Sequence, residues 1–204
     1  KDEKYKYFKV RGKNFEKLIF ESFRMRFETL QYYPNATYCD ENGQYELDQI
    51  IVSDDWIIII DEKSSSFVNN YTFIGNENEK LLNLKRSFGK GFISLSKAYK
   101  NFKSKNKICI NCKNKLINLN LEGKQIFIAM ITLNEIKSIS GSLSKICKEQ
   151  KLDHLPLLLS YSTLFEIFAN VKNIDEFLFY FKERDELINK NKNISFDVDE
   201  IDAY

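Results

Sequence analysis

The sequence predicts one α/β domain in which helices flank a central β-sheet, followed by a helical C-terminal tail. Apolar residues recur at helical spacing near the N-terminus and again after residue 80, and a tight-turn pair and a run of isoleucines lie between these stretches. With 7 glycines and 2 prolines among 204 residues, no linker divides the chain, and 43% hydrophobic residues exclude a mainly disordered state. An α+β arrangement of the same elements is the alternative. We expect residues 1–160 to form the core and residues 161–204 a helical extension packed on it.

The first expected elements are a helix and a β-hairpin. Between residues 15 and 30 the apolar side chains fall on one helical face, with Asn14 placed as an N-cap, which is typical of an amphipathic helix. Asn42-Gly43 is a strong tight-turn signal. It predicts a hairpin with arms at residues 36–40 and 44–52.

The next elements continue the alternation of strand and helix. The run Trp-Ile-Ile-Ile-Ile at residues 56–60 is apolar on both faces, so it belongs in the middle of a sheet. Apolar spacing predicts a helix over residues 81–102 with basic side chains on its other face, and Gly89 and Gly91 allow a break within it. The remaining elements are expected as strands at residues 125–133 and 155–160 and as helices at residues 134–150, 162–170 and 174–189.

The basic side chains are concentrated in one segment. The net charge of +2 arises from 31 basic and 29 acidic residues, but residues 80–121 contain eleven Lys and Arg and no acid. The local charge is therefore +11, and the rest of the chain is acidic, including the last 31 residues. A near-neutral chain can thus present a strongly basic face. The alternative explanation is that these lysines lie on a solvent-exposed helix face and bind no partner.

Several kinds of site are excluded by the residues that are missing. His154 is the only histidine, which removes two-histidine acid–base schemes and His-rich metal sites. Cys109 and Cys112 have zinc-knuckle spacing without a second pair, and Cys147 and His154 would complete the set only by folding against them. The glycine patterns of phosphate loops and dinucleotide-binding folds do not occur.

Cysteine usage and hydropathy bear on the compartment. Four cysteines, no signal-peptide pattern and no apolar run near the roughly 18 residues of a membrane span predict a cytoplasmic, reducing location without disulfides or a membrane partner. The chain begins with Lys rather than Met. Further domains in a longer chain, or a homodimer, are therefore compatible with it.

Acidic residues mark the candidate chemistry. Asp48 interrupts a strand that is otherwise apolar, and Asp61 and Lys63 end the isoleucine strand two residues apart, which places both on one face. Carboxylates at the rim of a sheet are costly unless they are paired or hold a cation, and Mg²⁺ takes one or two carboxylates together with water and phosphate. A simple surface ion pair between Asp61 and Lys63 is the alternative interpretation, but it would not explain Asp48.

These residues resemble the PD-(D/E)xK nuclease superfamily, over roughly residues 11–133. The resemblance implies a restriction-endonuclease-like αβββαβ core with a central mixed sheet. Glu16 matches the glutamate of the first helix, Asp48 the aspartate of the second core strand, and Asp61-Glu62-Lys63 the acid-x-lysine of the third. Leu47 stands where the motif has proline, and Asp rather than the commoner Glu fills position 61.

The resemblance further implies a Mg²⁺-dependent endonuclease, with Mg²⁺ or Mn²⁺ as cofactor. Asp48 and Asp61, the carbonyl of Glu62 and a water-mediated Glu16 would hold the metal, and Lys63 would orient or deprotonate the attacking water. The catalytic set is accordingly Asp48, Asp61, Lys63 and Glu16.

The basic helix would then follow a nucleic-acid backbone. The residues expected to contact it are Lys85, Arg86, Lys90, Lys97 and Lys100. DNA is favoured over RNA, because the site histidine usual in cap-snatching RNA endonucleases of this core has no counterpart here, although some of those enzymes lack it. The alternative is a catalytically inactive nuclease-like module that binds nucleic acid or docks a protein within a larger complex.

Overall fold

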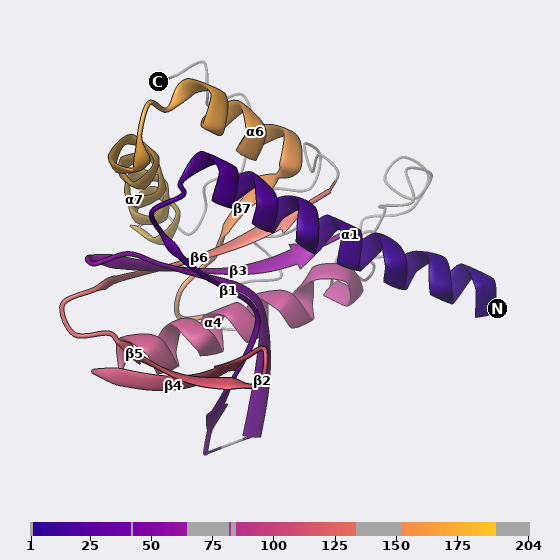
Figure 1. Cartoon of the computed structure of the whole chain (residues 1–204), viewed down its shortest axis with the longest axis horizontal. Helices are drawn as coiled ribbons and strands as arrows, with labels where there is room; N and C mark the ends of the chain where they lie inside the picture. The colour runs from indigo at the N-terminus through magenta and orange to yellow at the C-terminus, as the bar shows by residue number, and fades with distance from the viewer. Residues whose placement is uncertain (1, 42, 65–81, 83–84, 134–151, 191–204) are drawn as a thin grey trace.

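A computed structural model of the chain describes residues 2–41, 43–64, 82, 85–133 and 152–190, and shows an α/β fold built on a seven-stranded mixed sheet (Figure 1). The strand order is β5-β4-β1-β2-β3-β6-β7. The pairs β3–β6 and β6–β7 are parallel, and the other neighbours are antiparallel. The strands are β1 (Gln31–Asp40), β2 (Gly43–Val52), β3 (Trp56–Lys63), β4 (Lys107–Cys112), β5 (Lys115–Asn120), β6 (Gln125–Thr132) and β7 (Leu157–Ser160). The helices are α1 (Asp2–Arg26), a π-helical turn (Lys85–Gly89), α4 (Lys90–Lys103), α6 (Tyr161–Asn170) and α7 (Ile174–Lys190).

The predicted hairpin and central strand are confirmed. β1 and β2 pair from Gln31↔Val52 to Asp40↔Gly43, so the turn lies between Asp40 and Gly43, and Gly43 is already the first residue of β2. β1 begins at Gln31, five residues earlier than predicted, because residues 31–34 also pair with the end of β2. Residues 56–60 of β3 are buried between β2 and β6, as the apolar run requires.

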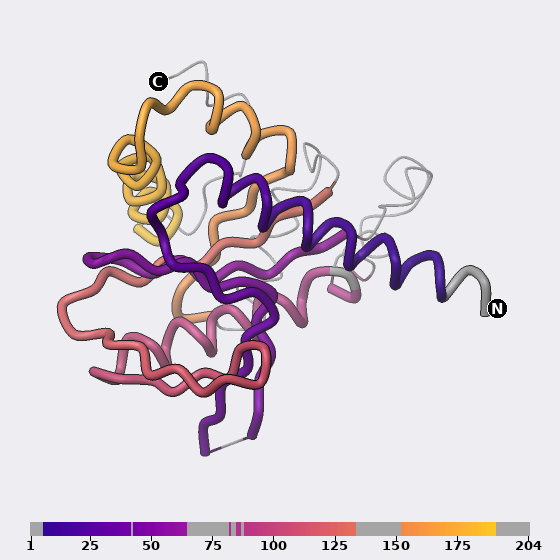
Figure 2. The backbone as a smooth tube through the Cα atoms, in the orientation of Figure 1, coloured from indigo at the N-terminus to yellow at the C-terminus, as the bar shows by residue number. Residues whose placement is uncertain are grey.

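Helix α1 is longer than the periodicity predicts. It starts at Asp2, so Asn14 lies inside the helix and the predicted cap is wrong. Residues 2–13 lack an apolar stripe, yet half of them are Lys, Arg or Glu, which favour a helix, and they extend the helix that the packed half forms. The N-terminal half therefore extends past the end of the sheet (Figure 2).

The helices cover the two faces of the sheet. α4 packs against β3 and β6 on one face, while α1, α6 and α7 lie on the other (Figure 1). An aromatic cluster joins α1 to the C-terminal helices, with Phe23 against Phe168 and Phe177 at centroid distances of 5.0 and 5.8 Å. The helix predicted at residues 134–150 falls outside the described residues. No helix in the described part of the chain is both long and apolar enough to span a membrane.

A second hairpin, β4–β5, extends the sheet beyond β1. Its two-residue turn has φ of 51° at Lys113 and 61° at Asn114, as a type I′ turn requires. Cys109 is exposed and Cys112 is buried on alternate faces of β4, and the Cys112 thiol donates to the carbonyl of Pro34 at 3.2 Å. The zinc-knuckle spacing thus lies along a strand, where its two sulfurs point apart.

The single histidine ties three elements together. The ring of His154 stacks on Tyr99 of α4 at 3.8 Å between centroids, and its Nε2 lies 2.7 Å from Oδ1 of Asp185 in α7. These contacts anchor the segment before β7 between the two helices.

Candidate active site

The candidate site lies where two central strands separate. β2 and β3 pair from Val52↔Ile57 to Gln49↔Ile60, and beyond that pair β3 continues alongside β6 alone. Asp48 and Asp61 are the next residues on the two strands, so they face each other across the opening. On the other side of β2, Asn35 has φ of 50° and is left out of the β1–β2 register, opposite Asp48. Asp48 thus stands at a local break in the sheet on both sides.

Asp48 is held by its neighbour strand. Its Oδ2 accepts a 2.6 Å hydrogen bond from the backbone amide of Glu62. Burial, and next the charge of Asp61, raise the pKa of Asp48 to about 7, and the Glu62 amide and Lys63 oppose that rise. A carboxyl that shares this gap with a second carboxyl is poised to gain a cation.

Asp61 and Lys63 lie on the α4 side of β3, as the spacing predicts. Nζ of Lys63 is 2.6 Å from the Asp61 carboxylate, and their side chains are 26% and 15% exposed. A Cβ at Gly91 of α4 would overlap Oδ2 of Asp61 and lie 3.0 Å from Cε of Lys63. Glycine at position 91 therefore lets α4 approach the pair closely. From the sequence, Gly91 was expected only to allow a break in the helix. Its place beside Asp61 and Lys63 depends on how α4 packs on the sheet.

Glu62 and Glu16 add two further carboxylates to the site. Glu62 is 7% exposed, and within the described part of the chain neither of its carboxylate oxygens has a hydrogen-bond partner. Burial first, then Asp48 and Glu16, raise the pKa of Glu62 well above its ordinary value. Burial raises the pKa of Glu16, and so do the charges of Glu46 and, to a smaller extent, Asp61. Glu62 was expected to act through its carbonyl, whereas the structure shows that its side chain belongs to the acidic cluster.

The donor chemistry fits a hard divalent cation. Carboxylate oxygens are the ligands that Mg²⁺ prefers, and the unpartnered oxygens of Glu62 and the raised pKa of Asp48 indicate more carboxylates at this point than the single ammonium of Lys63 neutralises. As the side chains are placed, no three His, Cys, Asp or Glu among the described residues form a closed ligand set. The residues suit the ion in kind, and their side chains would have to rotate to share one ion.

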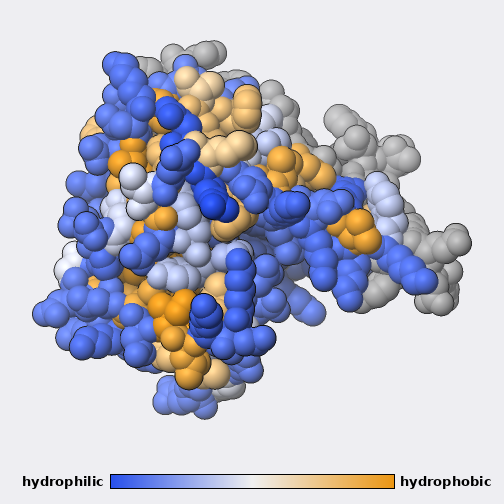
Figure 3. Space-filling view, viewed as in Figure 1, coloured by the Kyte–Doolittle hydropathy of each residue, from blue (hydrophilic) through white to orange (hydrophobic). Residues whose placement is uncertain are grey.

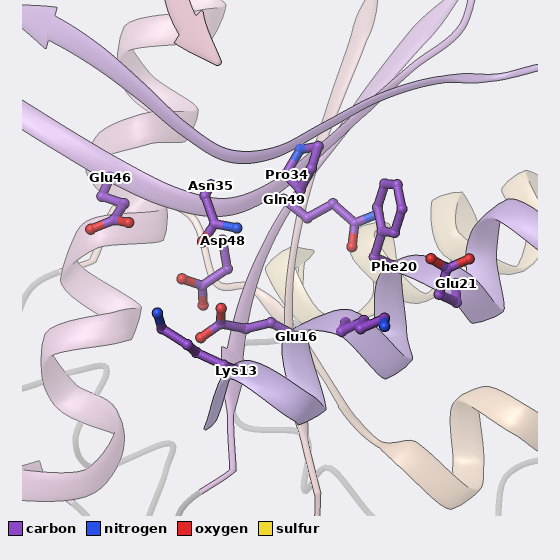
Figure 4. Close-up of a pocket in the computed structure, with 10 residues that line it drawn as sticks. Lys13, Glu16, Phe20, Glu21, Pro34, Asn35, Glu46, Asp48 and Gln49 are labelled. Atoms are coloured by element: carbon purple, nitrogen blue, oxygen red, sulfur yellow. The ribbon is translucent and has the colours of Figure 1, made fainter. Parts of the chain in front are cut away.

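A cavity of about 480 Å³ adjoins Asp48 on the α1 side. Figure 4 shows the carboxylates of Glu16 and Asp48 pointing toward one another, with the amine of Lys13 beside them. Lys17 also lines this cavity. The two lysines precede the basic segment in the sequence, so charge counting overlooked them. Arg11 fixes this part of α1, because its guanidinium donates to the carbonyl of Ser64 just after β3.

The predicted nucleic-acid-binding residues form two groups, one in the π-helical turn and the first residue of α4, the other further along α4. Arg86 and Lys90 are exposed on the turns next to Gly91, and Lys85 is half-buried beside them. Lys97 and Lys100 follow seven to ten residues later, Lys97 over the ring of Tyr45 at 5.7 Å and Lys100 4.0 Å from Asp153. Only the first group lies at the end of α4 that meets Asp61.

A search for relatives of the chain finds none among the known protein families and curated proteins compared with it. No protein-family model matches the chain, and a search of the curated proteins finds no match.

Proposed function

We propose that the chain is a metal-dependent nuclease that hydrolyses phosphodiester bonds of nucleic acid, with DNA favoured over RNA. The observation that carries the proposal is the meeting of Asp48, Asp61 and Lys63 at the point where β2 leaves β3. Two carboxylates that can hold a divalent ion, with a lysine beside them, are a set of groups that can carry out metal-assisted phosphodiester hydrolysis.

The order of elements supports the same proposal. A helix, three antiparallel strands, a helix and a parallel strand follow one another as α1, β1–β3, α4 and β6. This order is similar to the core of the PD-(D/E)xK superfamily, with β4–β5 as an inserted hairpin on the far edge. Fold similarity alone would not assign an activity, so the proposal depends on the site.

The cofactor of the proposed enzyme would be Mg²⁺ or Mn²⁺, held by Asp48 and Asp61 with the carbonyl of Glu62 and with Glu16 through water. The ion would stabilise negative charge on the scissile phosphate and lower the pKa of the attacking water. Lys63 places a positive charge beside the phosphate and orients that water, and Asp61 keeps the Lys63 ammonium in position. Glu62 contributes through its backbone as well, because its amide aligns the Asp48 carboxylate.

Basic residues lie on both sides of the site. Arg86 and Lys90 approach from α4, and Lys13 and Lys17 from α1, whose projecting half is largely hydrophilic on the face seen in Figure 3. Lysines that act as point charges bind phosphates without reading sequence. The substrate strand would therefore pass between the two helices at the end of β3.

The second candidate is an inactive module that binds nucleic acid or docks a protein. The observation that favours it is the 2.6 Å contact of Lys63 with Asp61, which neutralises one carboxylate without an ion.

One cleavage experiment separates the two candidates. The protein is incubated with linear, circular and single-stranded DNA and with RNA, with Mg²⁺ or Mn²⁺ or with EDTA, beside Asp61→Ala and Lys63→Ala. The proposal predicts cleavage that requires the ion and is lost in both variants. Cleavage that survives both substitutions would remove the assigned site, and binding without cleavage under every condition would favour the inactive module.

A further inference from the structure

The cavity between α1 and the β1–β2 hairpin is lined in part by residues that have no role in the proposed hydrolysis. Phe20, Pro34 and Gln49 line it, together with the exposed residues Lys13 and Lys17. Asp48 and Glu16 belong both to this cavity and to the acidic cluster of the candidate active site. The cavity thus adjoins that site.

Gln49 is an unsatisfied polar group in an apolar strand. It is 1% exposed, and among the described residues neither its Oε1 nor its Nε2 has a hydrogen-bond partner. Its neighbours on the same face of β2, Leu47 and Ile51, are buried and apolar. A buried amide without partners destabilises a fold, so packing does not explain a glutamine here.

The ring of Phe20 is held in a fixed orientation beside that amide. Tyr32 contacts the Phe20 ring edge-on at 5.9 Å between centroids, and the Tyr32 hydroxyl donates to the carbonyl of Phe27 at 2.6 Å. Figure 4 shows the Gln49 amide extending toward the Phe20 ring. A flat aromatic wall next to one donor and one acceptor matches a flat ligand that carries the complementary pair.

We propose that this cavity receives a nucleobase, turned out of the strand whose phosphate lies at Asp61 and Lys63. The inference rests on the proposed function and adds to it a base-binding subsite. The base would stack on Phe20 and pair with the Gln49 amide, while Lys13 and Lys17 face the adjoining backbone phosphates. Adenine is the expected preference, because Gln pairs bidentately with adjacent donor and acceptor atoms of adenine. The carboxylates that also line the cavity, Glu21 and Glu46 among them, favour an uncharged base over a second phosphate.

Free nucleosides test the subsite without any cleavage step. Adenosine, guanosine, cytidine and thymidine are titrated by ligand-observed NMR against the parent, Gln49→Met and Gln44→Met, with ribose and inorganic phosphate as probes that lack a base. Gln44→Met makes the same change in the same strand at an exposed position. We expect saturation transfer to the base protons of adenosine in the parent and in Gln44→Met, and at least about tenfold weaker binding in Gln49→Met.

Thermal unfolding gives a readout that a structural role would not produce. Gln49→Met keeps the volume and removes the unpartnered amide, so its melting temperature should rise while nucleoside binding falls. The inference is overturned if the parent shows no transfer to any base, or if Gln49→Met binds nucleosides as the parent does. A lowered melting temperature with unchanged binding would assign Gln49 to packing or to a bound water.

A cleavage assay separates this inference from the proposed function. Oligonucleotides with a single abasic position, moved stepwise along the strand, should be cut more slowly when the gap falls at the nucleotide next to the scissile bond. Metal-dependent cleavage that is indifferent to every abasic position and to Gln49→Met would leave the nuclease and remove the subsite. Nucleoside binding by a chain that cleaves no nucleic acid would keep the subsite and remove the nuclease.

Discussion

The backbone amide of Glu62 donates a 2.6 Å hydrogen bond to Oδ2 of Asp48 across the point where β2 leaves β3. In a continuous antiparallel ladder that amide would bond to a backbone carbonyl. Here a side chain takes the place of the backbone, so the separation of the strands and the position of the Asp48 carboxylate depend on each other. The carboxylate is thereby fixed opposite Asp61.

The electrostatics of Asp48 predict how stability varies with pH in EDTA. The folded protein holds the pKa of Asp48 at about 7, against about 3.9 for an unperturbed Asp, so the folded state binds this proton more tightly than the unfolded state. The contribution of Asp48 to the free energy of unfolding is therefore largest at low pH and is lost as the pH rises through 7. Urea unfolding should give a lower free energy of unfolding at pH 8.5 than at pH 6 for the parent, and a smaller decrease for Asp48→Asn. The exposed Asp153→Asn serves as control, and equal losses in all three proteins would contradict the assignment.

Replacing Glu62 should separate stability from cation binding. Glu62→Gln removes a buried charge that has no partner, and we expect the cation-free protein at pH 8 to gain on the order of 1 kcal/mol in the free energy of unfolding. The same change removes a carboxylate from the site, so Mn²⁺ affinity should fall. Denaturant unfolding and calorimetry measure the two effects, with the exposed Glu122→Gln as control. A loss of stability in Glu62→Gln would mean that its carboxylate is satisfied within the fold.

The close approach of α4 predicts an effect of a single methyl group. In Gly91→Ala the new Cβ would overlap Asp61 and lie 2.6 Å from Cε of Met130, all at the movable ends of side chains. Stability should change by less than about 1.5 kcal/mol, since the helix propensity of Ala offsets part of the crowding, while cleavage should fall because Asp61 and Lys63 are displaced. Gly12→Ala in α1 is the matched control, because its Cβ meets only Oγ of Ser64 at 3.6 Å. Equal activity in both variants would show that α4 does not position the pair.

Charge reversal tests which part of α4 follows the nucleic acid. Arg86→Glu with Lys90→Glu changes the end of the helix next to Gly91, and Lys97→Glu with Lys100→Glu changes positions about 10–15 Å further along. We expect the first pair to weaken oligonucleotide binding more and to lower the slope of log affinity against log salt by about two. Fluorescence anisotropy from 50 to 200 mM salt measures it. Equal effects would indicate a diffuse basic surface, and no effect at low salt would make the segment a solvated face.

Local signals in the sequence predicted the elements whose structure is set by nearest neighbours. The Asn42-Gly43 pair predicted the hairpin, whose strands meet at Asp40 and Gly43, and the isoleucine run predicted the central strand. The start of α1 was placed wrongly because the prediction followed apolar spacing, and the first half of the helix has no apolar period. The β4–β5 turn uses Lys113-Asn114, which is a weaker signal for positive φ than Asn-Gly.

Strand alternation predicted part of the candidate site. It placed Asp61 and Lys63 on one face and singled out Asp48 as a polar interruption. The same rule applied to Gln49 would have found a second polar interruption of β2, whose amide is buried without a hydrogen-bond partner among the described residues. The contact of Gly91 with Asp61 and the burial of the Glu62 side chain depend on how α4 and α1 pack on the sheet, and no local pattern encodes them.

The central claim is that the carboxylates at the strand opening bind a divalent cation, and calorimetric titration of EDTA-treated, dialysed protein with Mn²⁺ at pH 8 tests it most directly. We predict saturable binding of one or two ions by the parent and by Asp153→Asn, and its loss in Asp48→Asn and in Asp61→Asn. No binding by the parent, or binding that both site variants retain, would contradict the account.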